Sequence, residues 1–137
     1  MKINILLPYK EQFDKSKLSS VSITVINNLK HSKFKKEIRI FGRQVPDPSN
    51  LENFVGIKNS LNLFKSKNLN LAEQMCKCIL MDHDKNQLIE IHNRPKLIGY
   101  ILEKTKKKYP INIFFHNNPL DMVGSKSFKE REYIIKN

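Results

Sequence analysis

The feature that most constrains this chain is an apolar run that twice ends in the pattern His-Asn-x-Pro. Residues 88–91 lead into His92-Asn93-Arg94-Pro95, and residues 111–115 lead into His116-Asn117-Asn118-Pro119. Both runs are short, rich in β-branched and aromatic residues, and bounded by residues that favour turns, as is typical of strands. The sequence therefore predicts two strands that each end in a histidine and an asparagine.

The residues between the two runs are expected to form a helix. Their apolar side chains recur at spacings of three and four and so share one face: Leu97, Ile98, Ile101 and Leu102. Asn93 is the expected cap of this helix, and Pro95 suits its first turn because proline lacks an N–H that would be unused there. Lysines follow at 104 and 106–108, where the helix C-terminus favours cations, and Pro110 ends the segment.

A strand–helix–strand unit of this length predicts a right-handed crossover between parallel strands. The carboxyl ends of parallel strands lie at one edge of the sheet, so His92 and His116 are expected to emerge there, from neighbouring strands. Ligands of open α/β sheets bind outside this edge. A histidine after a strand is more often part of a turn, but two matched examples at one edge make a site as plausible as a pair of turns.

The remaining elements are predicted from periodicity. Strands are expected at 2–7, 37–41 and 54–57 (a short edge strand), helices at 18–30, 70–80 and 127–136, and loops at 10–17 and 42–53. Residues 18–30 also alternate as a strand would. As a helix, they would be capped by Ser19 or Ser20, and their N-terminus, a favourable place for an anion, would face the edge with the histidines. The helix at 70–80 is expected to bury a stripe made of Leu71, Met75, Cys78 and Ile79. At the start of the helix at 127–136, Ser127 and Glu130 fit a capping box.

Composition narrows the classes of protein. The 137 residues predict one domain, and the net charge of +12 favours an anionic partner, although only four of the 25 cations are arginines. A lysine excess also arises in AT-rich genomes, so a membrane surface, a phosphorylated ligand and RNA all stay open. Cys76 and Cys78 point to different faces of their helix, which predicts neither a disulfide nor a zinc site and favours a reducing, cytoplasmic setting. The adjacent Asp82-His83-Asp84 does not predict a metal site, and no run is long enough for a signal peptide or a membrane span.

Three segments resemble the N-terminal domain of GT-B fold glycosyltransferases of the family 4 type. They are residues 2–30 (first strand, loop and helix), LIEIHNRP at 88–95, and PINIFFHNNPLDMVGSKSFKERE at 110–132. The resemblance implies a Rossmann-like three-layer α/β sandwich with a mostly parallel sheet, the N-terminal half of a GT-B fold. It implies transfer of a sugar from a nucleotide-sugar donor to a glycan or lipid-linked acceptor, such as lipopolysaccharide or another cell-envelope glycan.

The resemblance also implies residue roles. His116 aligns with the active-site histidine near the reacting sugar, and Ser19 and Ser20 align with a Gly-Gly pair that approaches the donor phosphate. His92, Asn93 and Asn117 would line the cleft, and residues 10–17 would shape the acceptor pocket. No metal and no cofactor are implied beyond the nucleotide-sugar co-substrate.

Two departures from the family pattern matter. Ser-Ser replaces Gly-Gly, and serine allows close backbone approach less readily than glycine. The second domain, which carries most nucleotide contacts in the family, has no counterpart in residues 1–137, so this acceptor-binding domain is expected to need that domain or a partner subunit for turnover. The resemblance implies a cytoplasmic protein, with peripheral contact at the anionic inner membrane face as an option. Two alternatives remain: a basic α/β module that binds RNA or another polyanion, and a flavodoxin-like small-ligand domain.

Overall fold

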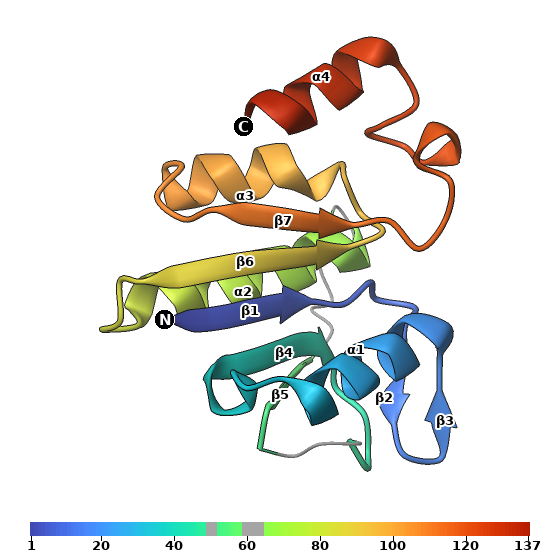
Figure 1. Ribbon diagram of the computed structural model, residues 1–137, viewed down its shortest axis with the longest axis vertical. Coiled ribbons are helices and arrows are strands. Elements are labelled where there is room, and N and C mark those ends of the chain that lie inside the picture. The colour runs from blue at the N-terminus through green and yellow to red at the C-terminus, as the bar shows by residue number, and fades with distance from the viewer. Residues whose placement is uncertain (49–51, 59–64) are drawn as a thin grey trace.

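The computed structural model describes residues 1–48, 52–58 and 65–137, and its centre is a five-stranded parallel sheet (Figure 1). The strand order is β5-β4-β1-β6-β7. The strands are β1 (Lys2–Leu6), β4 (Ile38–Arg43), β5 (Phe54–Ile57), β6 (Gln87–His92) and β7 (Ile111–Phe114). All four pairings are parallel, and the expected edge strand at 54–57 is confirmed.

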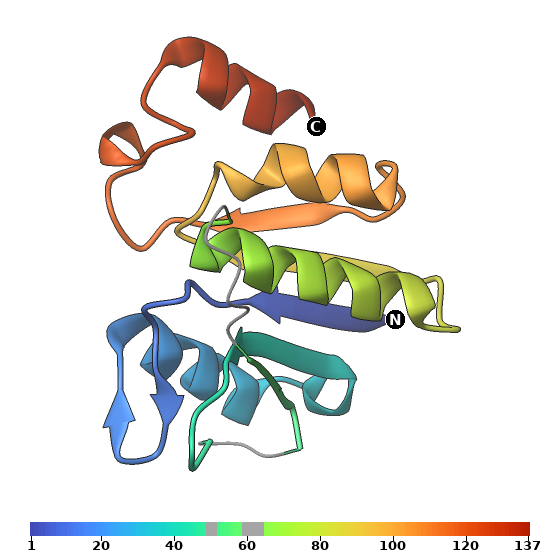
Figure 2. The ribbon, with the colours of Figure 1, turned by 180° about the vertical axis from the view of Figure 1, so that it is seen from behind.

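Helices on both faces of the sheet make the three layers of a Rossmann-like sandwich. The helices are α1 (Ser20–His31), α2 (Lys67–Met81), α3 (Leu97–Thr105) and α4 (Phe128–Lys136), with short 3-10 turns at η1 (Lys35–Glu37) and η2 (Pro119–Asp121). Helix α1 lies in front of the sheet in Figure 1, whereas α2 and α3 cover the opposite face in Figure 2. Helix α4 lies beyond α3, where Gly99 approaches Tyr133.

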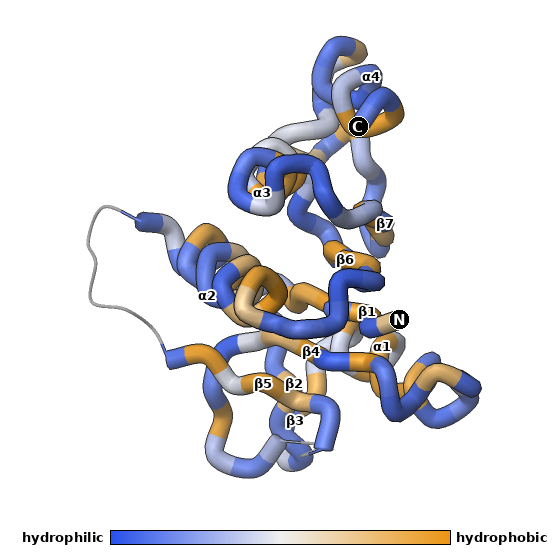
Figure 3. The backbone as a smooth tube through the Cα atoms, turned by 90° about the vertical axis from the view of Figure 1, so that its left-hand side faces the viewer, coloured by the Kyte–Doolittle hydropathy of each residue, from blue (hydrophilic) through white to orange (hydrophobic). Residues whose placement is uncertain are grey.

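Each face of the sheet has its own apolar core, as the hydrophobic strands between the helices in Figure 3 indicate. Val21, Val25 and Leu29 of α1 pack against Ile5 and Ile40. On the other face, a larger cluster joins the central strands to α2 and α3: Leu6, Phe41, Met75, Ile79, Ile89, Ile91, Ile98 and Ile101. The predicted stripe of α3 is buried as expected.

Helix α1 covers only half of its face of the sheet. Residues of β6 and β7 on that face keep solvent access: the side chain of Glu90 is 16% exposed and Phe114 is 43% exposed. In Figure 1 the front of β6 and β7 carries no helix. This open half leads directly to the carboxyl ends of both strands.

Several local expectations were wrong for identifiable reasons. The expected loop at 10–17 contains a hairpin, β2 (Phe13–Asp14) with β3 (Lys17–Leu18), because Phe13 is buried and stacks on Phe54 at 5.0 Å between ring centroids. In α2 the buried cysteine is Cys76, whereas Cys78 is exposed, and burial raises the pKa of the Cys76 thiol to about 11. The helix at 70–80 begins earlier, at Lys67. The part of the expected loop at 49–51 lies outside the described residues.

The observed helix boundaries confirm two of the predicted caps and contradict a third. Ser19 is the N-cap of α1, and the capping box of Ser127 and Glu130 at α4 is confirmed. Asn93 does not cap α3: the N-cap is Lys96, and Pro95 precedes it. Helix α3 ends because Lys106 and Lys107 adopt left-handed backbone angles, before Pro110 is reached. Among the described residues, no helix has both the length and the apolar character needed to cross a membrane.

A partly buried polar network surrounds Asp82 at the amino-terminal edge of the sheet. Its carboxylate accepts hydrogen bonds from Lys2 Nζ at 2.7 Å and from Arg39 Nη1 at 2.7 Å. Arg39 also donates from Nε to Oδ1 of the fully buried Asn4 and from Nη2 to Oε1 of Gln87. The hydrogen bond from Lys2, followed by one from the backbone N–H of Asp84, lowers the pKa of Asp82 to about 2.

We expect Asp82→Asn to lower the free energy of unfolding by about 1.5 kcal/mol near neutral pH, the usual worth of hydrogen bonds to a charged group. The folded-state pKa of about 2 lies below the ordinary 3.8, so this stabilisation is present above pH 3.8 and is lost as pH falls through about 2. Urea denaturation of both proteins between these pH values should therefore show the two stabilities converging. If the difference in unfolding free energy between the two proteins stayed constant with pH, the stabilisation could not come from the charge of Asp82.

Candidate functional site

The candidate site lies at the carboxyl edge of the sheet, where the chain direction diverges. The segment after β1 leads to α1 on one face, and the segment after β6 leads to α3 on the other (Figure 1). The strand order therefore switches between β1 and β6. Open α/β sheets bind ligands in the crevice at such a switch point.

The two histidines meet at this edge, as the sequence predicts. Strands β6 and β7 are neighbours, with His92 opposite Phe114 in the register. Nδ1 of His92 lies 2.6 Å from Nε2 of His116, and the two ring centroids are 4.9 Å apart. His92 is buried at 1% exposure, whereas His116 lies at the surface. The expectation that His92 and His116 emerge from adjacent strands is thus confirmed.

A third side chain, Glu90, completes a continuous line of hydrogen bonds. Its Oε1 lies 2.7 Å from Nε2 of His92. A carboxylate accepts, so Nε2 of His92 carries the proton and Nδ1 of a neutral His92 is an acceptor. His116 then donates from Nε2, and its Nδ1 has no hydrogen-bond partner among the described residues. These tautomers follow from the partners of each nitrogen, and they leave a basic nitrogen of His116 free for a ligand.

The surroundings of His116 favour its neutral form. Partial desolvation of the ring, followed by the nearby His92 ring, lowers the pKa of His116 below its usual value, and the carboxylates of Glu11 and Glu90 oppose this decrease. Glu11 comes from the segment after β1, so three segments of the chain contribute to the electrostatics of this histidine. A neutral imidazole near physiological pH can accept a proton from a ligand hydroxyl.

Asn93 positions the chain around His116. Its backbone adopts a left-handed conformation, φ 52°, and its side chain is 6% exposed. Oδ1 of Asn93 accepts a hydrogen bond from the backbone N–H of His116 at 2.7 Å, and the backbone N–H of Asn93 donates to the carbonyl of Phe114. The asparagine therefore joins the ends of β6 and β7.

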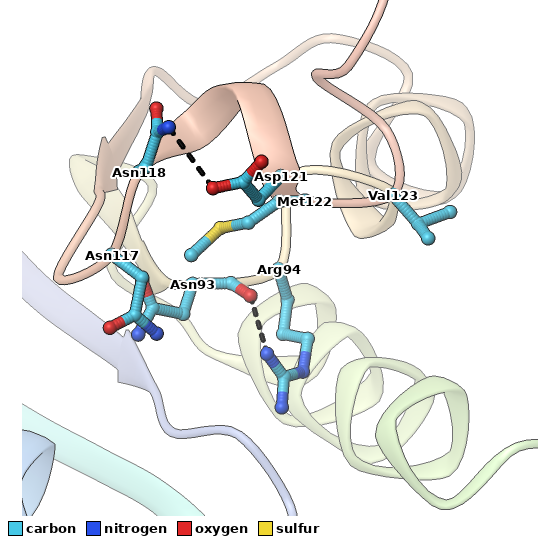
Figure 4. A pocket seen from close by; sticks show the side chains of 7 residues that line it. All are labelled: Asn93, Arg94, Asn117, Asn118, Asp121, Met122 and Val123. Carbon is cyan, nitrogen blue, oxygen red and sulfur yellow. Dashed lines mark hydrogen bonds between the residues drawn. The ribbon is translucent and has the colours of Figure 1, made fainter.

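A cavity of about 460 Å³ opens at the residues that directly follow the two histidines, and neither histidine lines it; Figure 4 shows its lining side chains. It is lined by the turn after β6 and the segment after β7: Asn93, Arg94, Asn117, Asn118, Asp121, Met122 and Val123. Arg94 donates from Nη1 to the carbonyl of Asn93, and Asn118 donates to the carboxylate of Asp121. Three amides, one cation and one carboxylate suit a ligand with several hydroxyl groups, since amides both donate and accept.

The predicted site residues divide into those that come together and those that do not. Asn93 and Asn117 line the cavity, and His92 and His116 form the hydrogen-bonded pair beside it. Ser19 and Ser20 lie at the N-terminus of α1, at the same edge of the sheet (Figure 1). Within the described part of the chain, no hydrogen bond joins either serine to the histidines. Ser19 Oγ instead accepts from the backbone of Gln12 and donates to Ser22.

Sequence reasoning missed Glu90, Arg94 and Asp121. Glu90 could have been found, because alternate residues of a strand share a face and Glu90 precedes His92 by two positions. Arg94 and Asp121 lie in turns, and the spacing of apolar residues in the sequence does not predict the conformation of a turn. In residues 1–48, 52–58 and 65–137, no group of three or more metal-ligating side chains could hold an ion.

Comparisons of the chain with protein-family models, with curated proteins and with solved structures find no match. The fold and the site define a Rossmann-like α/β protein with a histidine pair at the carboxyl ends of β6 and β7, and the function has to be argued from that geometry.

Proposed function

We propose that this chain is the acceptor-binding N-terminal domain of a glycosyltransferase that uses a nucleotide-sugar donor. The observation that carries the proposal is the neutral, surface-exposed His116, held by the buried His92 beside a cavity lined by amides. Glycosyl transfer requires an acceptor hydroxyl held in line with the anomeric carbon, and a neutral imidazole can orient or deprotonate it. The segments that resemble family 4 enzymes include both His116 and the asparagines of the cavity.

The proposed division of roles follows the geometry. His116 contacts the reacting hydroxyl or sugar, and Asn93 and Asn117 hydrogen-bond the hydroxyl groups of a glycan or lipid-linked acceptor. The N-terminus of α1, with Ser19 and Ser20, faces the same edge, where a helix dipole favours the donor diphosphate. A second domain or a partner subunit supplies the remaining nucleotide contacts.

We prefer this proposal to polyanion binding because of where the lysines lie. Lys104 and Lys106–Lys108 stand at the C-terminal end of α3, and Lys30 stands at that of α1, at the edge of the sheet opposite His116. Cations at helix C-termini complement the helix dipole. Part of the positive charge thus has a structural role that requires no nucleic acid.

The test is sugar transfer by the protein expressed from its own gene, with any partner that copurifies. It is incubated with radiolabelled nucleotide sugars and an envelope-lipid extract of its host. We expect His116→Ala to lower the rate by about a hundredfold, as for loss of a residue acting in acid–base catalysis. His83→Ala is the matched control, because His83 is exposed beyond α2 at the opposite edge. Transfer by His116→Ala within about twofold of the control would overturn the role of His116.

A further inference from the structure

Glu90, His92 and His116 form a line that runs from the sheet to the surface. The alternation of strand residues places Glu90 and His92 on the same face of β6, and the parallel register brings His92 beside Phe114. The rings of Phe114 and His116 both stack against His92, at 5.3 Å and 4.9 Å between centroids. Because both of its nitrogens are hydrogen-bonded, the buried ring of His92 is held in one orientation.

We propose that Glu90 and His92 form a proton relay behind His116, in which the positive charge gained by His116 is passed to the buried ring of His92. In this arrangement Glu90 and His92 are positioning residues, since neither lines the cavity. The relay deepens the proposed function and rests on it only for the source of the proton, the acceptor hydroxyl.

The proton balance of the relay is simple. The hydroxyl proton of the acceptor forms a new N–H bond at Nδ1 of His116, and the oxygen keeps the electron pair with which it attacks the anomeric carbon. The bond from that carbon to the diphosphate breaks, and its electron pair leaves with the diphosphate. At the same time the Nε2 proton of His116 moves to Nδ1 of His92, 2.6 Å away. His116 ends neutral, with its proton on Nδ1, and His92 ends as an imidazolium.

The charged groups around the two histidines favour the positive charge on the buried His92 over the exposed His116. Glu90 contacts His92 directly at 2.7 Å, so an imidazolium there gains a charge-assisted hydrogen bond. The two carboxylates that act on His116 are Glu90 on β6 and Glu11 in the segment after β1. Among the described residues, neither carboxylate makes a hydrogen bond to His116, and the ring of His116 is bonded to His92 alone. Burial of His92 opposes the transfer, and the carboxylate contact offsets that cost.

The relay predicts a spectroscopic signature that isolated histidines do not show. Imidazole ¹⁵N spectra of the full chain, recorded across pH without ligand, report which nitrogens carry protons. As the pair takes up one proton, we expect His92 to become protonated at both nitrogens, while His116 stays neutral and its proton switches from Nε2 to Nδ1. The exposed His31 and His83 are internal controls for these spectra. If His116 becomes an imidazolium while His92 stays neutral, the relay is wrong.

Two variants separate the relay from simple electrostatics. Glu90→Gln keeps the size of the side chain and removes the charge, so it should abolish the tautomer switch and lower the midpoint at which the histidine pair takes up its proton. Glu11→Gln removes a carboxylate that acts only through space, so it should lower the midpoint and leave the switch intact. A switch that persists in Glu90→Gln would overturn the proposal. Because these spectra require no ligand, their outcome is independent of the transfer assay that tests the proposed function.

Discussion

Replacing Asn93 with alanine is expected to lower the free energy of unfolding by about 3 kcal/mol. A left-handed conformation costs a non-glycine residue such as alanine about 1 kcal/mol. Loss of Oδ1 also leaves the backbone N–H of His116 without its acceptor, at a cost of about 1–3 kcal/mol for this partly buried hydrogen bond. Urea denaturation measures the sum, because a change in midpoint at constant slope reports stability.

Two further substitutions separate these two causes. Asn93→Gly removes the side chain but tolerates φ 52° without strain, so it should lose only the hydrogen bond to His116. Asn93→Asp keeps an acceptor oxygen in place and should be the least destabilised of the three. The expected order of stability is therefore Asp, then Gly, then Ala. An alanine variant as stable as the glycine variant would show that the backbone conformation carries no cost.

The coarse fold was predictable because its signals are local. Burial of Leu97, Ile98 and Ile101 follows from spacing alone, and a crossover of this length allows only parallel strands. The same reasoning places His92 and His116 at one edge of the sheet from the sequence alone. The same logic predicted the capping box of Ser127 and Glu130, where the pattern of residue types is specific.

Features that depend on distant contacts were not predictable. Asn93 has the residue type of a helix cap, yet its side chain bonds the backbone of His116, just after the next strand and 23 residues away. Phe13 lies in a polar segment, and its burial depends on distant residues, the apolar cluster around Val21 and the stacked ring of Phe54. Cys76 and Cys78 are close alternatives on the helical stripe, and the exact rotation of α2 against the sheet decides between them.

Substitution of Gly124 is expected to have the second large effect on stability, because this glycine fixes the segment that lines one side of the cavity. Its φ of +97° is strained for any other residue, and an added Cβ would lie 2.5 Å from the backbone nitrogen of Lys96 and 2.8 Å from its Cα. The next residue, Ser125, is fully buried and bonds the carbonyl of Pro119. We expect Gly124→Ala to push residues 119–127 away from the start of α3, at a cost of about 2–4 kcal/mol from backbone strain and steric clash.

The consequence should be local because α4 has no fully buried residue. Hydrogen exchange of Gly124→Ala should show lost protection in α4, with the sheet still protected, since weakly packed segments open separately from the core. Any ligand that fills the cavity would lose the wall formed by Met122 and Val123 and bind about tenfold more weakly, equivalent to about 1.4 kcal/mol.

Gly99→Ala is the matched control for Gly124→Ala. Gly99 lies within α3, and its added Cβ would meet the Tyr133 hydroxyl at an ordinary 3.5 Å. Alanine is favoured over glycine inside a helix by about 1 kcal/mol, so this variant should be at least as stable as the parent. If Gly124→Ala matched Gly99→Ala in stability and in the protection of α4, the close approach of Gly124 to Lys96 would not be what holds the cavity wall in place.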